Sequence, residues 1–252
     1  MRIKVTFVSS YEDAQVMLNY NYTLSSMIYG ITGSSSIDYC VYLNTKSNDP
    51  RGRRFKLFTF SNLLFSNYRV EQRYIRFGRC TIDWFVSSPV ARFKENLLSG
   101  IEGRRFINIG GVKLDVQKVE TIQAPVFSGE MKFTCISPIT VTAGKCPKWK
   151  SPHYIRYDED GFSEAVRKNL IKKYVVIHGK QPDDDRFEFE FDSEYIARRC
   201  GKIQKKIRFM NTDIVGFMAP FSVKGNPNLI EVGYHCGFGE KGSMGFGMAK
   251  PI

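Results

Sequence analysis

The order of predicted strands and helices restricts the fold of this chain more than any other feature. In its first half, residues 2–8 alternate like a strand, and residues 24–31 place apolar side chains at positions 24, 27, 28 and 31, which is helical spacing. The expected elements then continue with strands at 55–60, 74–77 and 81–86, a helix at 89–98, and strands at 104–109 and 112–122. The order is approximately β-α-β-β-α-β, which is typical of a ferredoxin-like domain.

The second half repeats this order. Its expected elements are a strand at 130–136, a helix at 162–177, strands at 186–191, 205–210 and 214–223, a short helix at 226–236 and a last strand at 246–250. We therefore predict an α+β protein of two tandem ferredoxin-like (RRM-like, βαββαβ) domains. The expected division is 1–124 and 125–252, with the boundary at the Gln-Ala-Pro-Val-Phe segment, residues 123–127.

Two local predictions are specific enough to be tested by the structure. The strands at 74–77 and 81–86 flank Gly78 and Arg79, a spacing that predicts a β-hairpin. The helix that starts after Pro89 is expected to stop at Gly100, because glycine commonly terminates helices.

Charge points to a polyanionic partner. The 252 residues contain 37 Lys and Arg against 25 Asp and Glu, a formal net charge of +12. Both halves are basic, so no single tail explains the excess. A basic, aromatic-rich folded protein favours nucleic acid as the partner.

Composition also excludes several classes of protein. No apolar run approaches the roughly 18 residues of a membrane span, and the first residues lack the apolar core of a signal peptide, so we expect a soluble cytoplasmic protein without a membrane partner. The six cysteines form no C-x-x-C pair, and the three histidines are scattered, so no metal site and no cofactor are expected.

The segment 237–247 contains five glycines among its eleven residues. Glycine permits positive φ and close backbone approach, and consecutive free amides form a nest that suits a phosphate. Gly247 is followed by Met248 and Ala249, so the segment is not a P-loop. We expect its amides, with Lys241 and Ser243, to contact RNA; a glycine-rich turn at a tight corner is the alternative.

Four stretches resemble one known family. They are 237–248, residues 18–22 with Met27-Ile-Tyr29, the strand Phe55-Lys-Leu-Phe-Thr-Phe-Ser61, and Ile136-Ser-Pro-Ile-Thr-Val141. In order and spacing they resemble the CRISPR-associated endoribonucleases, sixth in the CRISPR-associated series and part of the RAMP superfamily, that cut precursor CRISPR RNA within its repeats. The resemblance covers the whole chain and implies a prokaryotic, metal-independent enzyme that leaves a 2′,3′-cyclic phosphate and a 5′-OH.

The resemblance also implies catalytic residues. Tyr29 falls on the family's tyrosine and Lys56 on its lysine, whereas Asn44 stands where a histidine is usual; Tyr42 lies nearby. Without the family, Tyr29 reads as a half-buried core aromatic and Lys56 as an edge-strand charge. Because asparagine cannot exchange a proton near pH 7, a repeat-binding protein that does not cut remains the alternative.

RNA-binding residues are expected in both halves. They comprise a basic run before Lys56, a basic loop around a tryptophan, the start of one strand, and the glycine-rich segment: Arg51, Arg53, Arg54, Lys145, Lys148, Trp149, Lys150, Lys205, Lys206, Gly237, Gly239, Lys241, Ser243 and Gly245. Lysines beside an aromatic ring suit phosphate and base together. A CRISPR surveillance complex and a second copy of the chain are further candidate partners. His235, on a predicted helix, is read as a structural residue rather than a ligand.

Overall fold

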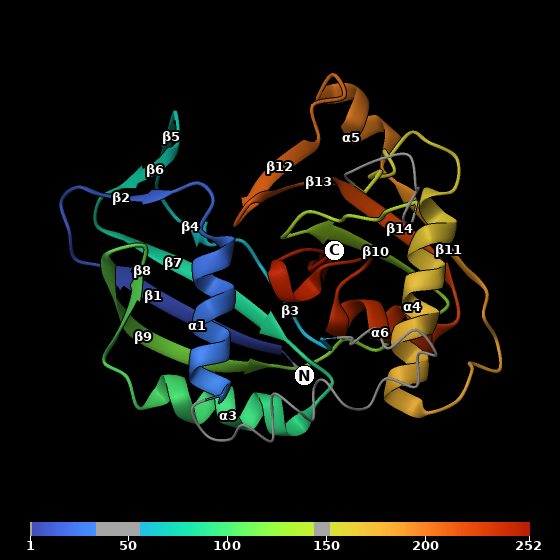
Figure 1. Cartoon of the computed structure of the whole chain (residues 1–252), viewed down its shortest axis with the longest axis horizontal. Helices are drawn as coiled ribbons and strands as arrows, with labels where there is room; N and C mark the ends of the chain where they lie inside the picture. Colours follow the sequence, from blue (N-terminus) through green and yellow to red (C-terminus); the bar gives the residue numbers. More distant parts are fainter. Residues whose placement is uncertain (1, 34–55, 144–151) are drawn as a thin grey trace.

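The computed structural model describes residues 2–33, 56–143 and 152–252 (Figure 1). The first half forms an antiparallel sheet with the order β3-β7-β1-β9-β8. Strand β4 also pairs with β7, at a different part of that strand from β3. Its strands are β1 (Arg2–Ser9), β3 (Thr59–Phe60), β4 (Leu64–Phe65), β7 (Cys80–Ser87), β8 (Phe106–Ile109) and β9 (Val112–Ile122). The central order β3-β7-β1-β9 is that of a ferredoxin-like sheet, in which the first strand lies between the third and the fourth.

Strand β1 is central because both of its edges are paired over almost its whole length. Arg2 to Ser9 pair with Ser87 to Cys80 on β7, and Arg2 to Val8 pair with β9, with a register shift between Thr6 and Phe7. Its alternation places Ile3, Val5 and Phe7 in the core, and Phe7 stacks on Trp84 of β7. The alternating sequence therefore covers one face of the sheet with apolar side chains.

Helices α1 (Asn21–Gly33) and α3 (Ala91–Glu102) cover the apolar face of this sheet. Leu24, Ile28 and Ile31 of α1 are buried, as the spacing predicts. The expected end of α3 at Gly100 is wrong, because the helix continues to Glu102. Gly100 lies instead where α3 meets α1: a Cβ there would come within 2.4 Å of Ile31 Cγ2, so glycine permits the close approach of the two helices.

The predicted hairpin across Gly78 is also wrong. Strand β6 (Tyr74–Phe77) pairs with β2 (Ala14–Met17) and β5 (Arg69–Glu71) in a separate three-stranded sheet, whereas β7 pairs with β1, β3 and β4. Two successive strands of alternating sequence with a glycine between them need not pair with each other. Burial decides here, because β7 contributes Ile82, Trp84 and Val86 to the main core.

The second half repeats the topology. Its sheet has the order β11-β14-β10-β15, made of β10 (Glu130–Cys135), β11 (Phe187–Phe191), β14 (Pro220–Gly225) and β15 (Ala249–Pro251). The helices are α4 (Phe162–His178) and α6 (Pro227–Cys236). A short helix α5 (Ser193–Arg198) and a two-stranded ribbon, β12 (Gln204–Phe209) with β13 (Thr212–Phe217), are inserted between β11 and β14. The expected single strand at 214–223 is therefore two strands.

Helix α4 packs on this sheet through the apolar positions expected from its sequence. Phe162, Val166, Leu170 and Tyr174 are buried, and Phe162 packs against Phe189 and Phe191 of β11. The spacing of four residues places these side chains on one face of the helix.

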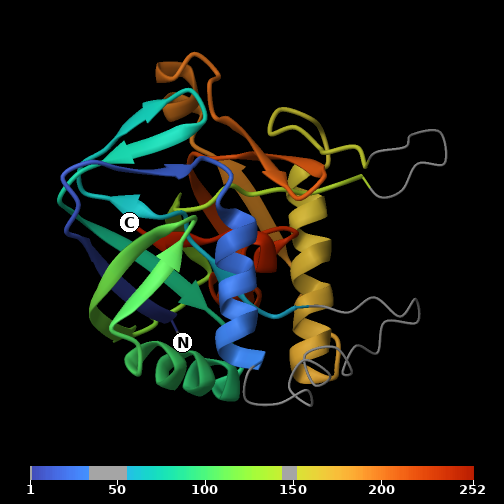
Figure 2. The ribbon, with the colours of Figure 1, turned by 60° about the vertical axis from the view of Figure 1, so that its left-hand side comes forward.

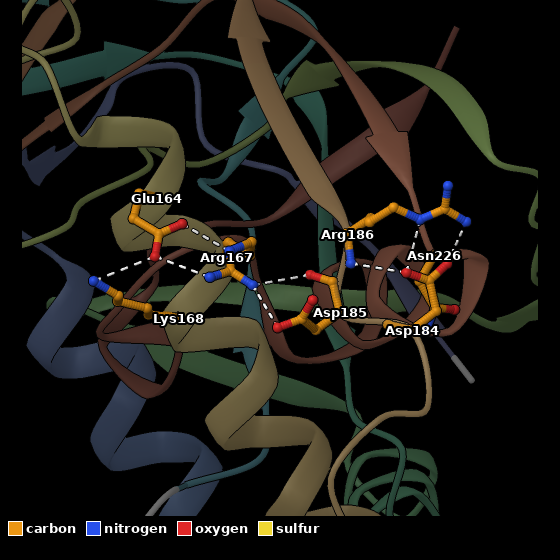
Figure 3. A network of polar contacts seen from close by, with 7 residues as sticks. All are labelled: Glu164, Arg167, Lys168, Asp184, Asp185, Arg186 and Asn226. Carbon is orange, nitrogen blue, oxygen red and sulfur yellow. Dashed lines mark hydrogen bonds and ion pairs between the residues drawn. The ribbon is translucent and has the colours of Figure 1, made fainter.

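A polar network ties the start of α4 to the turn before β11 (Figure 3). Arg167 forms an ion pair with Glu164 at 2.7 Å and with Asp185 at 2.8 Å, and its hydrogen bonds lower the pKa of Glu164 to about 2. Asn226 donates to the carbonyl of Asp184 and, as the N-cap of α6, accepts from Asn228 N at 2.9 Å. The turn is thus held between the beginnings of two helices.

The sequence-based prediction of the fold is confirmed. Two antiparallel sheets of ferredoxin-like order each carry two helices, and each has its own apolar core. Among the described helices, none is long and apolar enough to cross a membrane.

Candidate active site and the glycine-rich segment behind it

Tyr29 and Lys56, which are 27 positions apart in the sequence, lie together in the structure. The Lys56 Nζ lies 4.6 Å from the centroid of the Tyr29 ring, which is a cation–π contact. Tyr29 is on α1 and its half-buried ring packs edge-on against Phe58 at a centroid distance of 5.7 Å, whereas the Lys56 side chain is exposed. The pair thus combines a fixed phenol with a cation that a ligand can reach.

The Tyr29 hydroxyl is buried and has no hydrogen-bond partner among the residues that the structure describes. Most buried polar side-chain atoms in proteins are hydrogen-bonded, and an exception needs an explanation. A phenol whose ring lies under an ammonium group, and whose hydroxyl makes no hydrogen bond within the described residues, is suited to exchange a hydrogen bond or a proton with a bound substrate.

Several predicted residues lie outside the part of the chain that the structure describes. Segment 34–55 contains Tyr42, Asn44, Arg51, Arg53 and Arg54, and segment 144–151 contains Lys145, Lys148, Trp149 and Lys150. Their proposed roles therefore rest on the sequence.

The glycine-rich segment is not an exposed nest, and this expectation is corrected. Gly237, Gly239, Ser243 and Gly245 are all buried, and Lys241 is half-buried. Figure 2 shows the segment, drawn in red, between α1 and α4. The alternative interpretation, a glycine-rich turn at a tight corner, describes the segment better, because it fills the junction between the two domains.

Many backbone amides of this segment are already hydrogen-bonded within the protein. Phe238 N donates to Gly247 O at 2.8 Å, Glu240 N to Thr140 O at 2.8 Å, and Gly247 N to Pro138 O at 2.7 Å. The amides of Met244 and Gly245 close the short 3-10 helix η1 (Gly242–Met244) by donating to Lys241 O and Gly242 O. Amides used in this way cannot also bind a phosphate.

The segment contacts helix α1, which carries Tyr29, and strand β3, which begins three residues after Lys56. Asn21 Nδ2 and Ser25 Oγ of α1 donate to Met244 O at 3.2 Å and to Ser243 O at 2.9 Å. Thr59 Oγ1, three residues after Lys56, donates to Phe246 O at 2.9 Å. The glycine-rich segment is therefore hydrogen-bonded to the helix that carries Tyr29 and to the strand that follows Lys56.

The sequence analysis did not predict these contacts, which are made by Asn21, Ser25 and Thr59. Asn21, Ser25 and Tyr29 follow one another at a spacing of four residues, so they share one face of α1. Two polar residues on the same helical face as a candidate catalytic tyrosine are a signal that could have identified this contact.

Lys205 and Lys206 lie on β12, and both side chains are exposed. Lys206 Nζ pairs with Asp213 of β13 at 3.0 Å. The ribbon contacts the first domain, since Arg208 N donates to Asn19 Oδ1 at 2.9 Å and Phe209 packs edge-on against Tyr22. The basic ribbon therefore approaches α1 from the second domain.

His235 is buried on α6, as its structural interpretation requires. Its Nδ1 lies 3.3 Å from Ser87 Oγ and its Nε2 lies 3.9 Å from a Glu231 oxygen. Burial, assisted by nearby positive charge that includes Arg2, lowers its pKa to about 3. Desolvation thus outweighs the exposed carboxylate of Glu231, and the imidazole is neutral at pH 7.

This burial predicts a loss of stability in acid. Between pH 6.5 and 3 the unfolded chain binds a proton at residue 235 that the folded protein does not, so the free energy of unfolding falls as the pH falls, by up to about 1.4 kcal/mol per pH unit. Urea denaturation at pH 7 and 4.5 should show a smaller loss in His235→Gln than in the wild type. His178→Gln, which removes an exposed imidazole, is the matched control. Equal losses in all three proteins would contradict this assignment.

Comparison with known proteins identifies the family. The model of the Cas6 N-terminal domain matches residues 15–120, and the model of the Cas6 C-terminal domain matches residues 122–251. The chain belongs to the Cas6 family of CRISPR-associated proteins.

Curated Cas6 proteins match over nearly the whole chain. CRISPR-associated endoribonuclease Cas6 1 of Methanocaldococcus jannaschii is 31% identical over 93% of this chain and 86% of its own length. CRISPR-associated endoribonuclease Cas6 of Pyrococcus furiosus is 28% identical over 99% of this chain and 89% of its own length. The family and the enzyme class expected from the sequence, a CRISPR-associated endoribonuclease, are confirmed.

Solved structures agree with the Cas6 fold. A structure described as CRISPR associated protein Cas6 superposes with a TM-score of 0.79 at 28% identity, covering 100% of this chain and 99% of that one. A second, described as an RAMP protein binding different RNA substrates, has a TM-score of 0.82 at 22% identity and supports the fold alone; it covers 100% of this chain and 99% of that one.

Proposed function

We propose that this chain binds CRISPR repeat RNA and cuts precursor CRISPR RNA, without a metal ion, at a site that contains Tyr29 and Lys56. In this reaction a ribose 2′-oxygen attacks the adjacent phosphorus, a new P–O2′ bond forms and the P–O5′ bond breaks. The products are a 2′,3′-cyclic phosphate and a 5′-OH. The observation that carries the proposal is the Tyr29 side chain, whose ring contacts the ammonium group of Lys56 and whose buried hydroxyl has no hydrogen-bond partner among the described residues.

The two residues have different roles in this proposal. Tyr29 activates the 2′-OH, which has to lose its proton as it attacks. Lys56 offsets the negative charge that builds on the phosphate in the transition state, an electrostatic effect that is often the largest contribution to catalysis. Lys56 is exposed, so phosphate can approach it, and its contact with the Tyr29 ring holds the cation near the phenol.

The leaving 5′-oxygen needs a proton. Asn44 cannot supply one, because its amide does not titrate near pH 7. Tyr42 and Lys56 are the candidates for this role, and the arginines of residues 51–54 could assist the reaction in another way. Arginine stays protonated at any physiological pH, so it is suited to stabilise charge rather than to give up a proton.

One cleavage experiment tests the proposal. Labelled repeat RNA is incubated with the protein in excess EDTA, and the product ends are analysed for a 2′,3′-cyclic phosphate. The matched control is the same RNA with a single 2′-deoxy substitution at the cleaved nucleotide, which removes the nucleophile. We expect cleavage of the first RNA and none of the second. Strict dependence on magnesium, or equal cleavage of both RNAs, would contradict the proposed chemistry.

A repeat-binding protein that does not cut is the second candidate, and Asn44 at the usual histidine position favours it. Tight binding of repeat RNA that stays intact through many hours of incubation would support this candidate over the enzyme.

RNA affinity should depend on the exposed lysines of the β12–β13 ribbon. For a single-stranded nucleic acid, each phosphate neutralised contributes about −0.7 to the slope of log K against log salt. We expect Lys205→Ala to weaken binding and to make the slope less steep by roughly that amount. Binding isotherms at several salt concentrations measure it, and Lys172→Ala, an exposed change on α4, is the matched control. An unchanged slope in Lys205→Ala would remove the ribbon from the RNA-binding surface.

A further inference from the structure

Lys173 is a buried lysine that the proposed chemistry does not use. It lies on α4, and only 4% of its surface is exposed. Its Nζ donates to three backbone carbonyls, at 3.3 Å to Cys236 O, 2.6 Å to Gly237 O and 2.6 Å to Gly239 O. An ammonium group has three N–H donors, so these three acceptors satisfy it completely.

The position of this ammonium group explains why a lysine is stable there. Cys236 is the last residue of α6, and the unpaired carbonyls at a helix C-terminus carry partial negative charge that favours a cation. Burial raises the pKa of the Cys236 thiol to about 12, so the thiol stays protonated and no thiolate competes with the three carbonyls for the ammonium group. Burial also lowers the pKa of Lys173 to about 8, which still leaves the side chain largely protonated at pH 7.

Lys173 is connected to the candidate catalytic pair through the glycine-rich segment. Lys173 donates hydrogen bonds to the first carbonyls of the segment. The later carbonyls of the same segment accept hydrogen bonds from Asn21, Ser25 and Thr59. Ser25 lies one helical turn before Tyr29, and Thr59 lies three residues after Lys56. A change in the path of the segment would therefore move α1 and the strand that follows Lys56.

We infer that Lys173 is a positioning residue for the Tyr29–Lys56 pair and acts by fixing the backbone path of residues 236–247. This inference rests on the proposed function for its catalytic consequence. Two of its three acceptors, Gly237 O and Gly239 O, belong to the segment whose later carbonyls bond the first domain, so the effect of Lys173 is not confined to the second domain. Because a shift of about 1 Å in a catalytic group can lower a rate by 10²-fold, the effect should appear in the cleavage step.

The first test is a mutational cycle with matched controls. Lys173→Met removes all three donors, Lys173→Gln keeps two, and Lys172→Met makes the same change at the neighbouring, exposed position. Single-turnover cleavage at saturating protein should fall at least tenfold in Lys173→Met, less in Lys173→Gln, and not in Lys172→Met. The dissociation constant of the RNA should change less than threefold. All rates are measured well below the melting temperature of each variant.

The second arm separates positioning from general destabilisation. In a background that carries both Tyr29→Phe and Lys56→Ala, the additional effect of Lys173→Met should shrink to less than threefold, because both groups that Lys173 positions are already missing. An equal loss of rate in both backgrounds, or no loss in the wild-type background, would overturn the inference.

Hydrogen exchange of the free protein makes the inference independent of activity. Amides of residues 236–247 and of α1 should exchange faster in Lys173→Met than in Lys172→Met. Unchanged exchange in α1 would overturn the inference. If the wild-type protein did not cut RNA, the proposed function would fail, and faster exchange in α1 would still support the connection from Lys173 to Tyr29.

Discussion

Tyr29→Phe and Lys56→Ala are each expected to slow single-turnover cleavage of repeat RNA by roughly 100-fold, while the dissociation constant changes less than about threefold. General acid–base catalysis contributes typically 10²–10⁴-fold, and loss of one group that stabilises transition-state charge costs a similar factor. Tyr29→Phe keeps the ring and its edge-on contact with Phe58, so the change removes only the buried hydroxyl.

The controls for this prediction are chosen from the same surroundings. Tyr22→Phe removes the hydroxyl of an exposed tyrosine on the same helix, and Lys172→Ala removes an exposed charge from α4. Both controls should cut at the wild-type rate once RNA is saturating. If Tyr29→Phe and Lys56→Ala also cut at the wild-type rate, neither residue would take part in the mechanism. A loss that appears only in the dissociation constant would make them binding residues.

Substitution of the junction glycines is expected to have the second large effect, on folding. Gly247 has φ +81°, and a Cβ there would lie 2.3 Å from Phe238 O. Gly239 has φ +82°, and a Cβ would lie 2.5 Å from Thr140 O. Both contacts are with backbone atoms, which cannot move aside as a flexible side chain can. Gly247→Ala and Gly239→Ala should each lower the free energy of unfolding by roughly 3 kcal/mol or more, from backbone strain and overpacking together.

A matched control separates the two causes. Gly179 has φ +72° with no atom within 4 Å of the added Cβ, so Gly179→Ala introduces strain without a clash. It should cost about 1–2 kcal/mol. Urea denaturation followed by circular dichroism measures all three variants. Equal destabilisation in the three would show that positive φ alone requires glycine, and that the junction is less tightly packed than the distances indicate.

The burial of the segment reverses an expectation from the sequence. Valine at Gly239 or Gly245 would be expected to weaken RNA binding in a folded protein if the amides met RNA. In the structure, a Cβ at Gly245 would lie 2.5 Å from the Phe60 ring and 2.6 Å from Asn21 Nδ2, so the first effect of valine is on the domain junction.

The amino-acid sequence alone determined the architecture of this protein and named both residues of its candidate catalytic pair. Alternation in β1 and four-residue spacing in α4 are local patterns, and the β-α-β-β-α-β order leaves few ways to pair the strands of each domain. The positions of Tyr29 and Lys56 followed from the family resemblance, and the structure brings the two side chains together.

Only the tertiary structure decided which strands pair across Gly78 and what the glycine-rich segment does. Glycine in a sequence signals that a side chain is not tolerated, and it does so equally where a ligand approaches and where another part of the protein packs. Here the atoms that exclude a side chain belong to Phe238, Thr140 and Phe60. The contacts of Lys173 likewise could not be predicted from the sequence. Its three acceptors are backbone carbonyls more than 60 residues away, and every residue has such a carbonyl whatever its side chain.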